Sequence, residues 1–147
     1  MAQTLRLDDA DSQIDYGPRG SWQVVNNSGQ PWNLDGTYHR ASTLVSSFFL
    51  AFRGEWFSWP FPHIVADILT SGIGTSISLY GVRLPAGGIL DLLFDGENSS
   101  MILNSATNND ISLWSKEELV DGDHQVIGTV TAADGHSMPN FWLDYFE

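Results

Sequence analysis

The chain has 147 residues, with 18 acidic and six basic side chains and a formal net charge of −12 at pH 7. A chain of this length forms one domain and can bury roughly 70% of the surface that its unfolded form exposes. The negative charge disfavours nucleic acids and anionic membrane surfaces as partners, and a sequence without cysteine excludes disulfides and thiol nucleophiles.

Two regions bear on the location of the protein. Residues 1–6 lead into the acidic residues Asp8, Asp9 and Asp11 without the apolar stretch of a secretory signal, which favours a cytosolic protein or one shortened at this end. The longest mainly apolar region, 48–69, contains three charged residues, a histidine and two prolines. It is too polar and too broken to cross a bilayer as a helix, so we expect no membrane insertion.

Short β-prone runs alternate with turn signals along the whole chain, which is typical of an all-β sandwich. Ile77 and Leu79 alternate with polar neighbours, as a half-buried strand requires, and Asp95-Gly96 favours a tight turn. A single helical turn is predicted over 115–119. We expect ten strands, over residues 13–16, 22–25, 37–40, 46–52, 76–82, 89–94, 100–103, 111–114, 125–131 and 141–146.

Three tryptophans and one histidine are assigned structural roles. Trp22, Trp114 and Trp142 lie within apolar runs, which predicts that they belong to the core. His124 follows the turn-forming residues 121–123, so we expect a hairpin there, with His124 making local hydrogen bonds.

The preferred sugar site lies around position 35. A sugar site needs an aromatic platform and planar polar groups that bind adjacent hydroxyls. Trp32, Tyr38, His39 and Arg40 supply these groups within nine positions. The alternative is that Trp32 and Tyr38 pack inward, while His39 and Arg40 are ordinary surface residues of an edge strand.

Common catalytic motifs are missing from the sequence. It holds no Gly-x-Ser-x-Gly elbow, no His-Glu-x-x-His motif and no phosphate loop. The 18 acids offer many carboxylate pairs for a glycoside hydrolase, but nothing singles out two of them. We therefore expect a protein that is not an enzyme.

Several motifs occur in an order that resembles a known family. They are Asp8-Asp9-Ala10-Asp11-Ser12, Ser21-Trp22, Gly36-Thr37-Tyr38-His39, residues 74–81, Leu113-Trp114-Ser115, Asp121-Gly122-Asp123-His124 and Leu143-Asp144-Tyr145-Phe146. Over nearly the whole chain they resemble a galactose-binding-like domain of fungal secreted or membrane-anchored proteins. The resemblance implies one domain over 1–147, a jelly-roll-like antiparallel β-sandwich of two sheets with about 8–10 strands and little helix. It also implies a carbohydrate-binding role and an extracellular or cell-surface location. Such domains usually carry a signal sequence, and none is visible in this sequence, so the cytoplasm is the alternative location.

The same resemblance suggests a metal. Calcium-containing carbohydrate-binding jelly rolls, to which this chain is similar, hold a structural ion between acids of the first and last strands, and Asp9 and Asp144 occupy comparable places. Calcium suits such a place because it accepts six to eight hard oxygen ligands. The alternative is that both acids are solvated or cap turns. No cofactor is expected to be required, and calcium is the one candidate.

Residues 54–72 depart from the family pattern. This insertion carries Trp56 and Trp59 together with two prolines and other aromatic residues. It is interpreted either as an aromatic loop that stacks on sugar rings, as extra core or a translated intron, or as a dimerisation surface.

The sequence thus predicts a non-catalytic, lectin-like domain that binds glycans through Trp32, Tyr38, His39 and Arg40, with Trp56 and Trp59 as auxiliary platforms. The alternative function is a protein-interaction or self-association domain that uses 54–72, with a homodimer as its product.

Overall fold

The structure is a computed structural model that describes residues 6–26, 37–43, 45–54, 76–83, 87–103, 110–132 and 141–147. These residues form eleven strands and no helix. The strands are β1 (Leu7–Asp8), β2 (Ile14–Gly17), β3 (Trp22–Asn26), β4 (Thr37–Ala41), β5 (Val45–Gly54), β6 (Ser76–Arg83), β7 (Ile89–Phe94), β8 (Glu97–Ile102), β9 (Asp110–Glu117), β10 (Gly122–Thr131) and β11 (Phe141–Phe146). The ten predicted strands are all present, and β1 is an addition.

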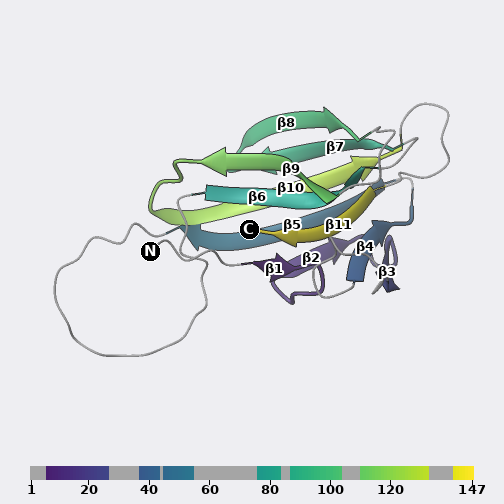
Figure 1. The fold of residues 1–147 in the computed structure, drawn as a ribbon. Coiled ribbons are helices and arrows are strands. Elements are labelled where there is room, and N and C mark those ends of the chain that lie inside the picture. Colours follow the sequence, from purple (N-terminus) through teal and green to yellow (C-terminus); the bar gives the residue numbers. More distant parts are fainter. Residues whose placement is uncertain are drawn as a thin grey trace.

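The strands form two antiparallel sheets, which confirms the predicted β-sandwich (Figure 1). One sheet has the order β3-β4-β11-β6-β9, with β1 also paired to β11, and the other has the order β2-β5-β10-β7-β8. Most connections cross from one sheet to the other, as in a jelly roll.

Two local predictions near the β9–β10 connection are wrong. The helical turn over 115–119 does not form, because Ser115, Lys116 and Glu117 continue β9 and pair with β6. The hairpin expected at residues 121–123 is a crossover instead, since β9 and β10 belong to different sheets.

The core lies between the two sheets and is built by alternating inward side chains. In β10, His124, Val126, Gly128 and Val130 are buried in alternation with more exposed neighbours. Gly128 is opposite Phe48 of β5, and a β-carbon at position 128 would overlap the Phe48 ring. The aromatic ring therefore occupies the space that the glycine leaves.

The predicted core tryptophans divide into two groups. Trp22 and Trp114 pack against the core cluster, as predicted. Trp142 is half-buried on the opposite face of β11, because its neighbours Phe141 and Leu143 both point into the core. Its ring contacts Tyr38 instead, at 5.3 Å between centroids.

The last strand brings the two ends of the chain together. Along one edge of β11, Trp142 and Leu143 pair with β4, and Tyr145 and Phe146 pair with β1. Asp144 lies between these two stretches, where the register with β6 shifts at a β-bulge. The junction of β1, β4 and β11 is therefore centred on Asp144. Among the described residues, no helix is long and apolar enough to span a membrane.

Candidate functional site at the junction of β1, β4 and β11

Three carboxylates meet at this junction. Asp8 ends β1, Asp9 follows it in a turn, and Asp144 occupies the bulge of β11. One carboxylate oxygen from each residue lies within 4.8 Å of the others. Asp9 and Asp144 are fully buried, and Asp8 is partly buried. The structure thus places the two acids singled out in the sequence side by side and adds Asp8, for which the signal was its position in the first acidic run.

Asp9 is held by three neighbouring side chains. Its Oδ1 accepts a hydrogen bond from Thr37 Oγ1 at 2.7 Å, and its Oδ2 lies 2.6 Å from His39 Nδ1. The Tyr16 hydroxyl donates to the Asp9 backbone carbonyl at 2.8 Å. Asp9 therefore links the turn after β1 to β2 and β4.

His39 is fixed in orientation by its contacts. Its ring stacks on Tyr16, with centroids 4.1 Å apart and an interplanar angle of 6°. Because an ionised Asp9 can only accept, the Nδ1 atom of His39 carries a hydrogen, which leaves Nε2 of the neutral ring as an acceptor. The side chain is 14% exposed. Most of the ring is thus buried packing, and a small part reaches the surface.

The electrostatics of the site also keep Tyr16 neutral. Burial raises the pKa of the Tyr16 phenol far above its usual value, and the negative charges of Asp9 and Asp8 raise it further. A tyrosine is already neutral at physiological pH, and this shift disfavours the ionised form further, so the phenol is a hydrogen-bond donor there.

The predicted sugar cluster is divided by strand geometry. Consecutive residues of β4 point to opposite faces of the sheet, so His39 turns toward Tyr16 while Tyr38 and Arg40 turn the other way. Tyr38 is fully buried and leaves no exposed ring face for a sugar. The structure brings His39 together with Asp9, and it does not bring it together with Arg40.

The remaining predicted sugar contacts lie outside the described residues. They are Trp32, Trp56 and Trp59. Of the insertion 54–72, only Gly54 is described.

The donor set at the junction fits calcium. Three carboxylates supply hard oxygens, and calcium takes six to eight of these in flexible geometry. A carboxylate oxygen has two lone pairs, so Asp9 keeps acceptor capacity beside its bonds to Thr37 and His39. Like charges this close and this buried repel one another, and His39 can contribute at most one positive charge. A divalent cation bound here would reduce this repulsion.

The sequence matches no protein-family model and no curated protein. Several solved structures share the fold. A family two carbohydrate esterase from Cellvibrio japonicus is similar with a TM-score of 0.55 and 14% identity, over 99% of this chain and 33% of that one. An exo-β-1,3-galactanase from Phanerochaete chrysosporium has a TM-score of 0.57 and 13% identity, over 99% of this chain and 29% of the galactanase. An insecticidal crystal protein has a TM-score of 0.60 and 15% identity, over 96% of this chain and 20% of the crystal protein.

These likenesses show the fold, and they correct one prediction. The chain spans a third or less of the length of these three proteins. Two of the three are enzymes, so the prediction that this chain is not an enzyme is contradicted. The missing motifs did not justify that exclusion, because a site on a β-sandwich can draw its residues from distant strands and needs no short sequence signature.

Proposed function

We propose that this chain is a carbohydrate-binding β-sandwich domain in which a calcium ion joins the first and last strands. The observation that carries the proposal is the junction of Asp8, Asp9 and Asp144 beside the oriented ring of His39. The proposed class of ligand is supported by the carbohydrate esterase and the galactanase, whose names show that they act on carbohydrates. An extracellular or cell-surface location belongs to the same proposal, because glycans are plentiful there.

In this proposal His39 is the polar sugar contact. Its Nε2 atom accepts a hydrogen bond from a sugar hydroxyl, while Asp9 and the Tyr16 ring prevent the imidazole from turning away. A contact held in place before binding loses little conformational entropy when the ligand arrives. Trp32, Trp56 and Trp59 are the proposed stacking platforms, because indole faces suit the apolar faces of sugar rings.

The calcium ion has a structural role in this proposal. Asp8, Asp9 and Asp144 would hold it, and it would supply the positive charge that compensates their buried carboxylates. Since Asp8 and Asp144 lie on different strands, a shared ion would tie β1 to β11 at the point where the pairing of β11 changes.

The test is a glycan-array screen of the purified chain in calcium-containing buffer, followed by titration with the best glycan. We expect binding to a chemically related set, and a loss of at least about tenfold in affinity, or about 1.4 kcal/mol, for His39→Ala and Trp32→Ala. Arg40→Ala is the matched control, because Arg40 lies next in sequence but faces the other side of β4. A blank array from protein that melts cooperatively would overturn the proposal.

A further inference from the structure

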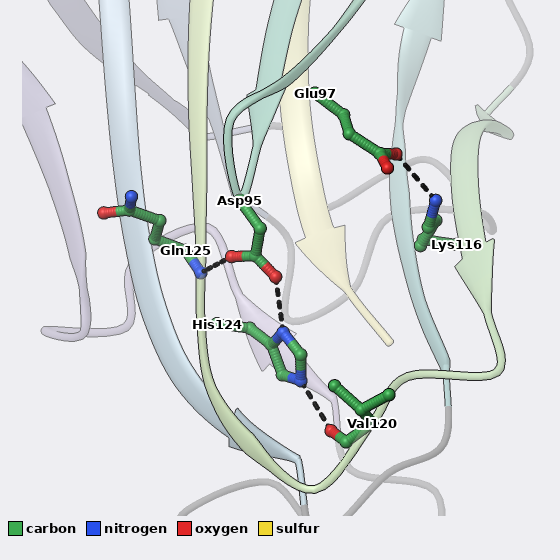
Figure 2. A network of polar contacts seen from close by, with 6 residues as sticks. All are labelled: Asp95, Glu97, Lys116, Val120, His124 and Gln125. Atoms are coloured by element: carbon green, nitrogen blue, oxygen red, sulfur yellow. Dashed lines mark hydrogen bonds and ion pairs between the residues drawn. The ribbon is translucent and has the colours of Figure 1, made fainter.

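His124 joins three parts of the chain where β9 crosses to β10 (Figure 2). Its Nδ1 atom lies 2.5 Å from Oδ2 of Asp95, in the turn between β7 and β8. Its Nε2 atom lies 2.8 Å from the carbonyl oxygen of Val120, in the connection between β9 and β10. The His124 side chain is only 5% exposed. One buried imidazole therefore ties the crossover between the two sheets to a hairpin turn.

Asp95 is itself held in position for this contact. Its Oδ1 accepts from the Gln125 backbone N–H at 2.8 Å, and its own N–H donates to the Gln125 carbonyl at 3.2 Å. The residue adopts a positive φ of 47°, followed by Gly96 at 88°, as a two-residue hairpin turn requires. The other carboxylate oxygen of Asp95 therefore points at the His124 ring (Figure 2).

Two neighbouring aromatic rings pack against the imidazole. The Phe94 ring is stacked on it at 5.7 Å between centroids, and the Phe52 ring lies at 5.4 Å. These rings limit the access of water, so a polar atom of His124 that lost its protein partner would gain little solvation in return.

The two contacts of the ring require one more proton than a neutral imidazole carries. A backbone carbonyl can only accept, so Nε2 bears a hydrogen toward Val120. Asp95 faces Nδ1 with Oδ2, and an ionised carboxylate can only accept, so Nδ1 bears the second hydrogen. The ring that satisfies both contacts is the imidazolium. A neutral ring has one hydrogen and leaves a lone pair facing either Asp95 or Val120.

The charges around the ring favour the protonated form. Burial lowers the pKa of His124, but the hydrogen bonds to Asp95 and Val120 and the charges of Asp95 and Asp123 act in the opposite direction, and the net pKa is raised. From β5 and β7, uncharged Phe52 and Phe94 face the ring.

Two further pairs of opposite charges lie nearby, and the charged residue Asp121 lines the same surface depression as His124. Arg53 lies opposite Asp123 in the β5–β10 register. Glu97 and Lys116 form an ion pair of their own at 2.8 Å, beside the turn that carries Asp95 (Figure 2).

We propose that His124 is a pH-sensitive clasp, in which the protonated ring holds the β9–β10 connection against the β7–β8 turn and loss of its proton releases that connection. The connection includes Glu118, whose φ of 58° is uncommon for a residue other than glycine, and Val120, which is exposed apart from its carbonyl contact. It also borders a surface depression lined by Ala51, Asp121 and Gly122. Its release would change the shape of that surface, independently of the proposed carbohydrate and calcium sites.

The test is an NMR titration of the wild-type chain combined with amide hydrogen exchange between about pH 5.5 and 9. We expect both ring nitrogens of His124 to be protonated at the acidic end, and a titration midpoint above the ordinary value of about 6.5. Above that midpoint, the protection factors of residues 119–122 should fall at least about tenfold, while those of Leu90 and Leu92 in β7 stay unchanged.

Two matched variants distinguish the direct contact between Asp95 and His124 from the general effect of nearby negative charge on the ring. Asp95→Asn removes the carboxylate that contacts Nδ1 and should abolish the pH-dependent change in protection. Asp123→Asn removes a neighbouring charge without a contact to the ring, so it should lower the midpoint slightly and keep the change. A neutral His124 ring at the acidic end, or equal protection of residues 119–122 on both sides of the midpoint in the wild-type chain, would overturn the proposal.

Discussion

Asp9 Oδ2 lies 2.6 Å from His39 Nδ1 and joins the turn after the first strand to the fourth strand. The carboxylate is fully buried, and its second oxygen accepts from Thr37, so both of its oxygens have protein partners. This pair stands next to Asp8 and Asp144 at the place where β11 changes partner from β4 to β1. The stability of the junction should therefore depend on Asp9 more than on any neighbouring surface acid.

Replacing Asp9 with asparagine tests this dependence. Asp9→Asn places an amide group where two donors converge, and the loss of these hydrogen bonds should outweigh the relief of repulsion from Asp8 and Asp144, so the free energy of unfolding should fall by about 1–3 kcal/mol. The measurement is urea unfolding in EDTA, which keeps a metal from contributing. Asp11→Asn is the control: Asp11 Oδ1 accepts from the Gln13 N–H in a turn, asparagine can do the same, and the change should stay within about 0.5 kcal/mol. Equal stabilities of the two variants would contradict the role given to Asp9.

Calcium should raise the melting temperature if the three carboxylates bind it. At a free concentration of 100 Kd, an ion that binds only the folded state adds about 2.7 kcal/mol, which corresponds to roughly 5–10 °C for a domain of this size. Asp144→Asn should remove most of this shift, whereas Asp11→Asn should retain it. Identical melting curves of the wild-type chain in calcium and in EDTA would exclude the ion and leave the carbohydrate proposal standing.

Local patterns were enough to place the strands. The alternation around Ile77 and Leu79 and the turn at Asp95-Gly96 are properties of short segments, and both have the expected form in the structure. The two-residue strand β1 could not be predicted in this way. Leu7 and Asp8 have no β-prone pattern of their own, and they become a strand because Phe146 and Tyr145 offer an edge for pairing.

The candidate site was predicted less well, for two physical reasons. Nearness in sequence was taken for nearness in space at His39 and Arg40, although adjacent residues of a strand face opposite ways. The contact between His124 and Asp95 spans 29 positions and depends on where a turn in one hairpin meets a crossover from the other sheet. Such a contact is fixed by topology, which the short-range pattern does not contain.

Gly128 should be intolerant of any side chain. A methyl group at this position would overlap the ring of Phe48, which is itself buried in the core, so Gly128→Ala should lower the free energy of unfolding by about 1–3 kcal/mol. Thr129→Ala, on the adjacent and less buried position of β10, should cost less than about 1 kcal/mol. A double-mutant cycle with Phe48→Leu decides the cause. If overlap with the ring is responsible, the double variant should be at least about 0.5 kcal/mol more stable than the sum of the two single effects predicts. Strict additivity of the two effects would contradict this explanation.

The contribution of His124 to stability should depend on pH in one direction. Its pKa in the folded protein is raised, so the unfolded chain, with a value of about 6.5, releases the proton first as the pH increases. The stabilisation is therefore complete below about pH 6.5 and is lost as the pH rises through the folded-state pKa. Urea unfolding of the wild-type chain and of His124→Gln should differ by about 1–3 kcal/mol near pH 6 and by less near pH 9. The other histidines are common to both proteins and cancel in the difference, so a difference that is constant from pH 6 to 9 would show that the His124 ring contributes packing alone.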